Sequence, residues 1–387
     1  MYAILANKEK YKILVVLRWL GGIRTFCRYV YNNFEKERFE FTFLAPDVPE
    51  MQYLLDDLKN LEITYIPIKC DPAHANLDLR IVYRTILKGR FDLIHSQGFT
   101  AGAYSALPAY VRKIPHLMTL HEVFTDGQFA GWQGPLKKIL IRSIMPFIDL
   151  VHCVSHSAGK NFIEYLPNMN NGRMIVVPNG IEVDRFLNTE RRNLREVLFL
   201  NEDTFLIGFF GRFMSPKGFK YLVDALWILV NEKKTPKKPM VIAVNDGGFL
   251  NAEKRRIAEL GLNEYVIFMP FQPNVAPVMK GMDVIVMPSL WEACPLQTME
   301  TLISGVPFIG TDIPPIKEIL EGTPGKMVTP RDAKSLADAI YLELQNPSRK
   351  EAEDYAIYAA KKFDVKNQAY ELQETILHLI EGNKSRK

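Results

Sequence analysis

The chain has few cysteines and no long apolar run, and each absence excludes a class of protein. Its four cysteines, spread over 387 residues without a C-x-x-C pair, indicate neither a disulfide framework nor a zinc site. A reducing compartment fits this cysteine usage best. No uncharged apolar stretch reaches the about eighteen residues of a membrane span, so no transmembrane helix is expected. The N-terminal segment MYAILANKEK also lacks the charge order of a signal peptide.

The net charge is small. The formal value is +4, spread along the chain, and the sequence therefore shows no basic patch for nucleic acid. Apolar residues make up 48% and charged residues 24%, which is typical of an ordinary globular protein. A chain of 387 residues is too long for one core. We therefore expect two domains.

Short apolar, β-branched runs recur along the chain, and segments long enough for helices separate them. This alternation predicts an α/β fold in which parallel sheets have helical crossovers, arranged as two Rossmann-like doubly wound domains. In the first half we predict strands at 12–18, 40–46, 62–68, 92–96, 116–121, 150–155 and 174–178. In the second half we predict strands at 205–210, 240–245, 265–271, 283–288, 307–310 and 326–328.

A polar stretch at 183–203 divides these two sets of strands. We therefore predict an N-terminal domain at 1–185 and a C-terminal domain at 200–365. The last segment, 366–383, has apolar residues at helical spacing, and we assign this helix to the N-terminal domain. Two such domains facing across a cleft would bind ligands at the carboxyl ends of their strands.

The first segment with chemical content is GRFMSPKG, directly after the predicted strand 205–210. Gly211 permits a sharp turn, while Arg212 and Lys217 can both point at one anion such as a diphosphate. The alternative is a solvated basic turn that Ser215 caps.

The second segment is PSLWEACPLQTMETLISG, after the predicted strand 283–288. Glu292 and Glu300 carry carboxylates that can accept paired hydrogen bonds from the vicinal hydroxyls of a sugar and a ribose. The amides of Leu296 and Gln297 open a helix between them, and a helix N-terminus favours phosphate. The alternative is that both glutamates occupy exposed helix or cap positions.

Together these segments resemble the family-four glycosyltransferases, which have the two-domain GT-B fold. The E-x7-E element corresponds to Glu292 and Glu300, and the G-R-x4-K-G loop begins at Gly211. The segment VPNGIEVDRF, 177–186, is similar to the stretch that connects the domains in this family. The resemblance implies retaining transfer of a hexose-type sugar from a nucleotide-diphosphate sugar to a glycan or lipid-linked acceptor. Cell-envelope or exopolysaccharide synthesis is the family's commonest setting.

The resemblance also implies roles in the N-terminal half. Gly21 and Gly22, in the loop GGIRTF after the first predicted strand, would let the backbone approach the donor's diphosphate. His121, at a strand end, corresponds to the family's histidine near the transferred sugar, although a hydrogen-bonded structural histidine is the alternative. His95 also matches a family position and is expected to line the acceptor side. Gln97 stands where a second histidine is frequent.

No D-x-D sequence occurs, so the usual motif that holds a diphosphate through a divalent cation is missing. We expect Arg212 and Lys217 to stabilise the leaving diphosphate in its place, with neither a metal nor a cofactor besides the nucleotide sugar. We assign catalytic roles to these two residues, Glu292 and His121.

A basic amphipathic segment lies at 135–148, with the sequence PLKKILIRSIMPFI. Such a helix can lie on an anionic bilayer, so we expect a cytoplasmic protein that can bind peripherally at the inner face of the cell membrane. The alternative is an ordinary surface helix whose apolar side packs on the sheet.

Three other functions remain open from the sequence. A nucleotide-sugar epimerase of the same fold would not be expected to pair E-x7-E with G-R-x4-K-G. A non-catalytic sugar-nucleotide-binding protein would not need Arg212, Lys217, Glu292 and Glu300 intact. A dinucleotide-dependent oxidoreductase would have G-x-G-x-x-G after the first strand, which is absent.

Overall fold

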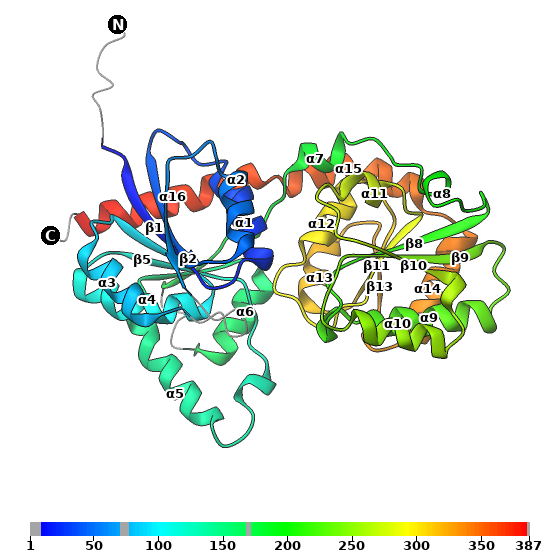
Figure 1. Ribbon diagram of the computed structural model, residues 1–387, viewed down its shortest axis with the longest axis horizontal. Helices are drawn as coiled ribbons and strands as arrows, with labels where there is room; N and C mark the ends of the chain where they lie inside the picture. Colours follow the sequence, from blue (N-terminus) through cyan, green and yellow to red (C-terminus); the bar gives the residue numbers. More distant parts are fainter. Residues whose placement is uncertain (1–8, 70–76, 168–171, 385–387) are drawn as a thin grey trace, which may run out of the picture. The chain divides into compact units, whose positions relative to one another are not determined.

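The computed structural model describes residues 9–69, 77–167 and 172–384, and the chain divides into two compact units. The first unit contains residues 1–180 and 365–387, and the second contains residues 181–364 (Figure 1). Cys70 and most of the segment MYAILANKEK lie outside the described residues. The polar stretch 183–203 belongs to the second unit, where it forms the short helices α7 (Val183–Leu187) and α8 (Leu194–Val197).

The first unit is built on a parallel sheet of seven strands in the order β3-β2-β1-β4-β5-β6-β7. Every strand predicted for this half of the sequence is present, within two residues at each end. The inner strand β1 is buried along most of its length, as is typical of a continuous apolar run in a sheet covered on both faces. The strands are β1 (Tyr11–Leu17), β2 (Phe39–Pro46), β3 (Ile63–Ile68), β4 (Leu93–Gln97), β5 (His116–Leu120), β6 (Leu150–Cys153) and β7 (Met174–Val176).

Helices connect these strands, because two parallel strands need a long crossover between them. Two begin at an ordinary N-cap: Asp78 accepts from Arg80 N at the start of α3, and Ser155 accepts from Ala158 N at the start of α6. The helices are α1 (Gly21–Tyr31), α2 (Pro49–Asp57), α3 (Leu79–Lys88), α4 (Phe99–Arg112), α5 (Gly134–Ile144), α6 (His156–Tyr165) and α16 (Val365–Lys384).

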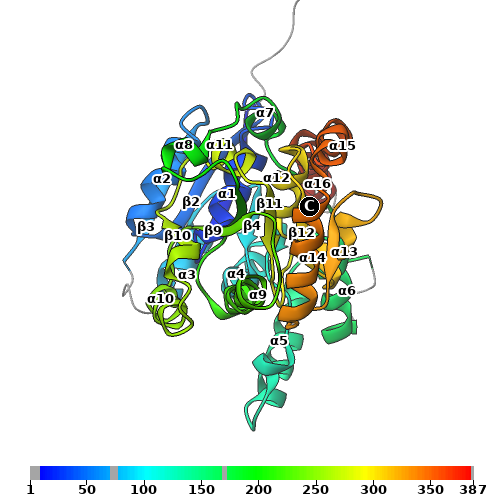
Figure 2. The same ribbon diagram turned by 90° about the vertical axis from the view of Figure 1, so that its right-hand side faces the viewer.

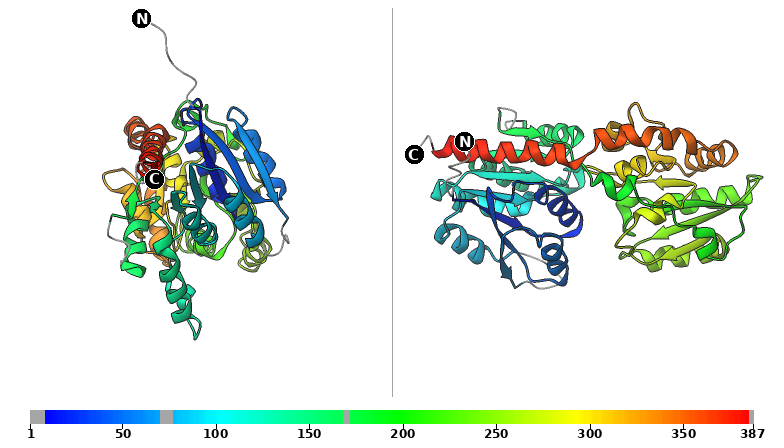
Figure 3. Two further views of the ribbon diagram at one scale, coloured as in Figure 1. Left: turned by 90° about the vertical axis from the view of Figure 1, so that its left-hand side faces the viewer. Right: turned by 90° about the horizontal axis from the view of Figure 1, so that it is seen from above.

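The C-terminal helix α16 belongs to the first unit, and two buried glutamines attach it (Figure 3). Gln373 Nε2 donates to Glu35 Oε1 at 2.6 Å, and its Oε1 accepts from Glu35 N at 2.8 Å. Gln368 Nε2 donates to Asn179 Oδ1 at 2.9 Å, and its Oε1 accepts from Gly180 N at 2.8 Å. Each amide therefore uses both its donor and its acceptor to fix the helix against a segment far away in the sequence.

The second unit is built on a parallel sheet of six strands in the order β10-β9-β8-β11-β12-β13. All six predicted strands are present, and the predicted α/β class with two doubly wound sheets is confirmed. The strands are β8 (Thr204–Phe210), β9 (Lys238–Val244), β10 (Val266–Met269), β11 (Val284–Met287), β12 (Phe308–Thr311) and β13 (Lys326–Val328). Besides α7 and α8, the helices are α9 (Phe219–Asn231), α10 (Leu250–Glu259), α11 (Ala276–Lys280), α12 (Leu296–Ile303), α13 (Pro314–Leu320), α14 (Ala333–Gln345) and α15 (Arg349–Lys362).

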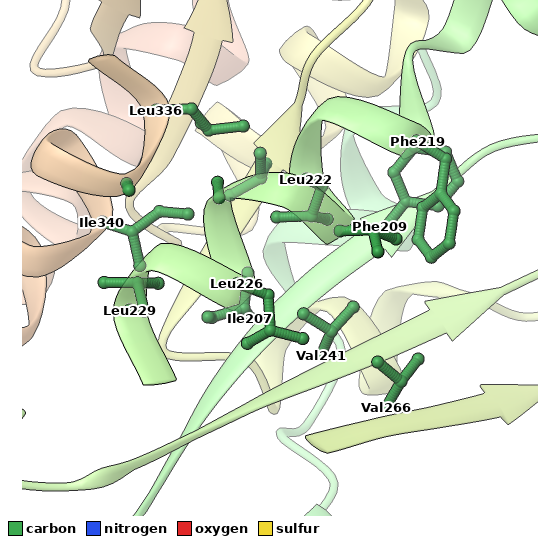
Figure 4. Close-up of a cluster of buried hydrophobic side chains, with 14 of the residues drawn as sticks. Ile207, Phe209, Phe219, Leu222, Leu226, Leu229, Val241, Val266, Leu336 and Ile340 are labelled. Atoms are coloured by element: carbon green, nitrogen blue, oxygen red, sulfur yellow. The ribbon is translucent and has the colours of Figure 1, made fainter. Parts of the chain in front are cut away.

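The main core of the second unit lies between its sheet and the helices α9 and α14, which pack next to each other (Figure 2). Leu222, Leu226 and Leu229 recur at helical spacing on α9, and Leu336 and Ile340 do the same on α14. Figure 4 shows these side chains over the strand residues of the same cluster. Burial of a side chain of this size stabilises the folded unit by roughly 1.5–3 kcal/mol. The core thus supports β8, whose carboxyl end carries the first candidate loop.

Candidate active site

The candidate residues follow strands at the place where each sheet reverses its order. Strand β1 pairs with β2 on one side and β4 on the other, and β8 likewise pairs with β9 and β11. The crossovers from β1 and from β4 therefore leave in opposite directions, as do those from β8 and β11. Open α/β sheets bind ligands outside the carboxyl ends of the strands at such points. The predicted loops after β1, β8 and β11 lie at these points, whereas His121 follows β5 and His95 lies within β4.

In the second unit an ion pair joins the two predicted loops. Lys217 Nζ lies 2.6 Å from Glu292 Oε1, and Ser289 Oγ donates to the same oxygen at 2.8 Å. The Lys217 side chain is 26% exposed and that of Glu292 is 13% exposed. The structure thus brings together a cation and a carboxylate that are far apart in the sequence, at the switch point of this sheet.

Backbone contacts hold the two loops at this distance. Leu290 N donates to Pro216 O at 2.7 Å. Gly218 has a φ of +67°, and a Cβ at this position would lie 1.9 Å from Pro288 O. Only glycine permits both the left-handed backbone and this close approach. The glycine that ends G-R-x4-K-G therefore permits the contact between the two loops.

A third loop, after β9, supports the start of the basic loop. Phe213 N donates to Asp246 O at 3.1 Å, and Phe249 N donates to Phe213 O at 3.0 Å. Phe213 is fully buried, whereas the neighbouring Arg212 is exposed. Gly211 begins the loop, where its N lies 3.4 Å from Val244 O. The backbone is thus anchored while the guanidinium remains accessible to an anion.

Helix α12 begins within the second loop, and its first turn contains Leu296 and Gln297. The N–H groups of a first helical turn have no acceptor within the helix, and no side chain caps this one. Gln297 Nε2 is buried and has no hydrogen-bond partner among the described residues. Glu300 lies one turn further along and is partly buried. This helix start therefore offers several donors beside the Lys217–Glu292 pair.

In the first unit the predicted glycines start a helix instead of lying in a loop. Gly21 is the first residue of α1, whose N-terminus has neither a side-chain cap nor an acidic residue in its first turn. A Cβ added at Gly22 would meet no atom within 4 Å. The first turn of α1 is therefore open to an anion.

His121 follows β5 and contacts residues of β4 and α1. Its Nε2 lies 2.7 Å from Gln97 Oε1, and its ring meets Phe26 edge-on with 4.7 Å between ring centroids. The side chain is partly exposed. Burial, which is the larger cause, and the neighbouring His152 lower the pKa of His121 to about 3. The imidazole is therefore neutral at pH 7, with one N–H and one lone pair.

The expectation for His95 is corrected, because this side chain has no exposed surface. Its Nδ1 lies 2.9 Å from Tyr31 Oη and its Nε2 lies 2.7 Å from Thr119 Oγ1. Burial, which is the larger cause, and the neighbouring histidines lower the pKa of His95 well below its usual value. A histidine with both ring nitrogens hydrogen-bonded in the interior cannot line the acceptor side.

A row of buried polar side chains behind His121 was not identified from the sequence. Gln97 is opposite Thr119 in the register of β4 and β5, and Thr119 is opposite His152 in that of β5 and β6. All three are buried and lie on one face of the sheet, since residues in register across parallel strands share a face. The available signal was polar residues at period two, such as His95 and Gln97, in strands that are otherwise apolar.

The predicted membrane segment contains α5, in which Ile141 and Ile144 pack against the core of the first unit while the remaining apolar side chains stay exposed. Leu136, Ile139 and Leu140 are 59–64% exposed, and Trp132 just before the helix is 85% exposed. Figure 1 shows α5 projecting away from the sheet of its unit. Within the described residues, no helix combines the length and the apolar character needed to cross a membrane.

Comparison with known proteins identifies the family. A model described as Glycosyltransferase Family 4 matches residues 20–185, and one described as Glycosyl transferases group 1 matches residues 204–346, so the two together match most of the chain. The chain belongs to the family-four glycosyltransferases. It is accordingly a glycosyltransferase with the GT-B fold.

Individual relatives of this transferase are distant. It is 21% identical over 318 residues to the UDP-Gal:alpha-D-GlcNAc-diphosphoundecaprenol alpha-1,3-galactosyltransferase of Escherichia coli, covering 79% of this chain and 80% of the relative. It is 27% identical over 244 residues to the lipopolysaccharide core biosynthesis mannosyltransferase LpsB of Rhizobium meliloti, covering 60% and 64%. The structure of Anabaena Alr3699/HepE in complex with UDP-glucose has a TM-score of 0.79 at 21% identity, covering 94% of this chain and 99% of that one.

We expect the buried histidines to make the first unit of the transferase sensitive to acid. Burial lowers the pKa of His116 to about 3 and that of His152 to about 4, and it lowers the pKa of His95 well below its usual value. Below a pH of about 6.5 these histidines bind protons in the unfolded chain but not in the folded one. The free energy of unfolding therefore decreases as the pH is lowered. We expect each of these histidines to lower the free energy of unfolding by about 1.4 kcal/mol for every pH unit between about pH 6.5 and 4.

Limited proteolysis in increasing urea measures the stability of each unit at pH 7.5 and 5.5, when the fragments are assigned by mass spectrometry. The second unit is an internal control, because the sequence has no histidine between 181 and 364. We expect the unfolding midpoint of the first unit alone to drop clearly. Equal shifts in both units would show that the histidines are not the cause.

Proposed function

We propose that this transferase moves a hexose-type sugar, with retention of configuration, from a nucleotide-diphosphate donor to a glycan or lipid-linked acceptor without a metal ion. The observation that carries the proposal is the Lys217–Glu292 pair at the switch point of the second sheet, beside an uncapped helix start. The E-x7-E and G-R-x4-K-G elements of the family support the assignment of retention.

The second unit offers groups that suit a departing diphosphate. When the anomeric bond breaks, negative charge grows on the diphosphate and positive charge grows on the sugar. Arg212 and Lys217 would stabilise the diphosphate, together with the amides of Leu296 and Gln297. Donors that are already held in place cost little reorganisation during the reaction. We therefore assign the two cations the role that a metal ion has in other transferases.

The two glutamates suit hydroxyl groups. Glu292 Oε1 already accepts hydrogen bonds from Lys217 and Ser289, so hydrogen bonds from a sugar would be accepted mainly by Oε2. Glu300, on α12, would accept from the ribose. Lys217 then contacts the leaving group while it orients the carboxylate that holds the transferred sugar, and both ends of the breaking bond depend on one side chain.

For the first unit we propose two contacts. The open first turn of α1 at Gly21 and Gly22 would accept the diphosphate, and His121 would contact the transferred sugar. Retention is explained if the acceptor hydroxyl attacks the sugar from the same face from which the leaving group departs. A phosphate oxygen of the leaving group then takes the proton of that hydroxyl. This route needs no carboxylate nucleophile.

We expect Lys217→Ala to lower donor turnover by on the order of a hundredfold or more, as loss of one preorganised contact to the developing charge does. The variant should fold, because the side chain is partly exposed. Release of nucleoside diphosphate from UDP-, GDP-, ADP- and TDP-sugars in excess chelator is the measurement. Lys233→Ala is the matched control, since Lys233 pairs with Asp338 in the same unit and is also 26% exposed.

Near-normal turnover of Lys217→Ala would contradict the site assignment. Turnover that appears only after a divalent ion is added would contradict the metal-independent mechanism. If no donor releases its nucleotide, donor binding measured by calorimetry on the same panel distinguishes a missing acceptor from a protein that binds no nucleotide sugar.

Gly22→Ala tests the first turn of α1. The new methyl group meets nothing in this chain, and alanine favours a helix over glycine by about 1 kcal/mol. We therefore expect an unchanged or raised melting temperature. A diphosphate bound against the backbone would collide with the methyl group, so donor affinity should fall at least about tenfold, corresponding to roughly 1.4 kcal/mol. Unchanged affinity for the donor would remove Gly22 from the binding site.

We further propose that α5 places the transferase on an anionic membrane, where it would reach a lipid-linked acceptor. Its exposed apolar side and the neighbouring Lys137, Lys138 and Arg142 have the character of an interfacial helix. The name of the Escherichia coli relative includes a diphosphoundecaprenol-linked sugar, which supports a lipid-linked acceptor here.

Lys137→Glu combined with Lys138→Glu should weaken binding to anionic vesicles by at least about tenfold, since each basic residue near such a surface contributes roughly 1 kcal/mol. Vesicle co-sedimentation at two salt concentrations measures it. Lys36→Glu with Lys59→Glu is the control, because it changes the charge equally at exposed positions outside α5. Equal weakening by both pairs, or no binding by the parent protein, would exclude α5 as the contact.

A further inference from the structure

A continuous chain of hydrogen bonds runs from a backbone carbonyl in the first unit to His121, and its inner end has a fixed direction. His152 Nε2 lies 2.9 Å from Val177 O. A carbonyl oxygen can only accept, so Nε2 carries the proton and donates. A neutral imidazole has one N–H, so His152 Nδ1 is an acceptor. Thr119 Oγ1, 3.0 Å from this nitrogen, must therefore donate its hydroxyl proton to it.

The same reasoning passes through His95. The Thr119 oxygen has used its proton, so toward His95 it can only accept, and His95 Nε2 donates across 2.7 Å. His95 Nδ1 is then an acceptor, and Tyr31 Oη donates to it across 2.9 Å. Each step leaves one arrangement of protons, because every partner has a single proton to give.

The outer end of the chain reaches His121. The Tyr31 oxygen now accepts, and the amide nitrogen of Gln97 donates to it across 2.8 Å. The amide oxygen of Gln97 therefore faces His121, and it must accept from His121 Nε2 across 2.7 Å. The direction set at the Val177 carbonyl thus determines which nitrogen of His121 carries the proton.

Burial makes this direction costly to change. Tyr31, His95, Gln97, Thr119 and His152 are each at most 1% exposed, so water does not offer alternative partners. Burial lowers the pKa of both histidines and raises the pKa of Tyr31 well above its usual value, so each group keeps the proton count that the argument needs. A reversed chain would leave a buried donor or acceptor unsatisfied.

We propose that Gln97 and Tyr31 are positioning residues that hold His121 as the Nε2–H tautomer, so that Nδ1 presents a lone pair to a hydroxyl group of the bound sugar. No hydrogen bond to His121 Nδ1 occurs within the described parts of the chain. A nitrogen that can only accept recognises a hydroxyl and does not bind a phosphate oxygen. The hydroxyl part of this proposal rests on the proposed function, whereas the tautomer does not.

The tautomer can be measured without any substrate. In protein labelled with ¹⁵N in its histidine rings, long-range ¹H–¹⁵N spectra show which nitrogen of His121 carries the proton, and a His121→Ala spectrum assigns the signals. We expect the Nε2–H form in the parent protein. The Nδ1–H form as the main species would overturn the proposal.

Thr119→Val tests whether the direction is transmitted. Valine fills the same volume without a hydroxyl, so His95 is no longer oriented from the inner end of the chain. Thr119 is three hydrogen bonds away from Gln97, so any effect on His121 must be transmitted through them. We expect the Nδ1–H form of His121 to appear and kcat/KM to fall about two- to tenfold, the range for one neutral hydrogen bond. Thr119→Ser keeps the hydroxyl and should restore both. A purely structural role would leave the His121 tautomer unchanged in Thr119→Val, and that result would overturn the proposal.

Tyr31→Phe interrupts the chain nearer to His121 and serves as the second variant if Thr119→Val does not fold. Tyr65→Phe is its control, because it removes a tyrosine hydroxyl that also donates a hydrogen bond in the first unit, to Pro46 O at 3.0 Å, but lies outside the chain of hydrogen bonds. The expected tautomer together with a variant rate equal to the parent rate would overturn the role in sugar recognition. Absence of any donor turnover in the parent protein would instead count against the proposed function, while the tautomer result stands.

Discussion

Parallel pairing of all the strands in each sheet is the constraint on which the rest of this structure depends. It places every carboxyl end at the same edge, and the order reversal beside β1 and β8 leaves this edge open where the crossovers diverge. Loops that are 75 residues apart in the sequence, such as those of Lys217 and Glu292, become neighbours for this reason. One left-handed glycine, Gly218, permits the close contact of these two loops.

The Lys217–Glu292 pair is best understood as preorganisation and not as a source of stability. A partly exposed ion pair contributes about 0–1 kcal/mol, which a unit with a large apolar core does not need. The pair does fix two long side chains, and Ser289 fixes the carboxylate from the other side. A side chain that is already ordered loses less entropy when a ligand arrives. The geometry therefore favours ligand binding more than it favours folding.

The sequence was sufficient for the elements and for the charged motifs. Every strand was predictable because apolar β-branched runs are the signal that parallel strands leave, and Arg212, Lys217, Glu292 and Glu300 were visible as strings with fixed spacing. The role of Gly218 was not predictable, because the Pro288 carbonyl that it approaches lies 70 residues away. The burial of His95 was missed for a related reason: a polar residue near a strand end is exposed or buried according to which helix covers it, and Tyr31 of α1 covers this one.

The buried glutamines show the same limit from another direction. Gln368 and Gln373 are polar residues of an amphipathic helix, and each hydrogen-bonds one donor and one acceptor on a distant segment. Burial of an amide is costly unless both ends are paired, so these two residues define the register of α16 more strictly than its apolar face does. Apolar contacts tolerate a slide of one turn, because leucine, isoleucine and alanine can exchange neighbours. A two-point amide contact does not, and it is this kind of polar pairing, invisible in a periodicity, that makes the position of the helix unique.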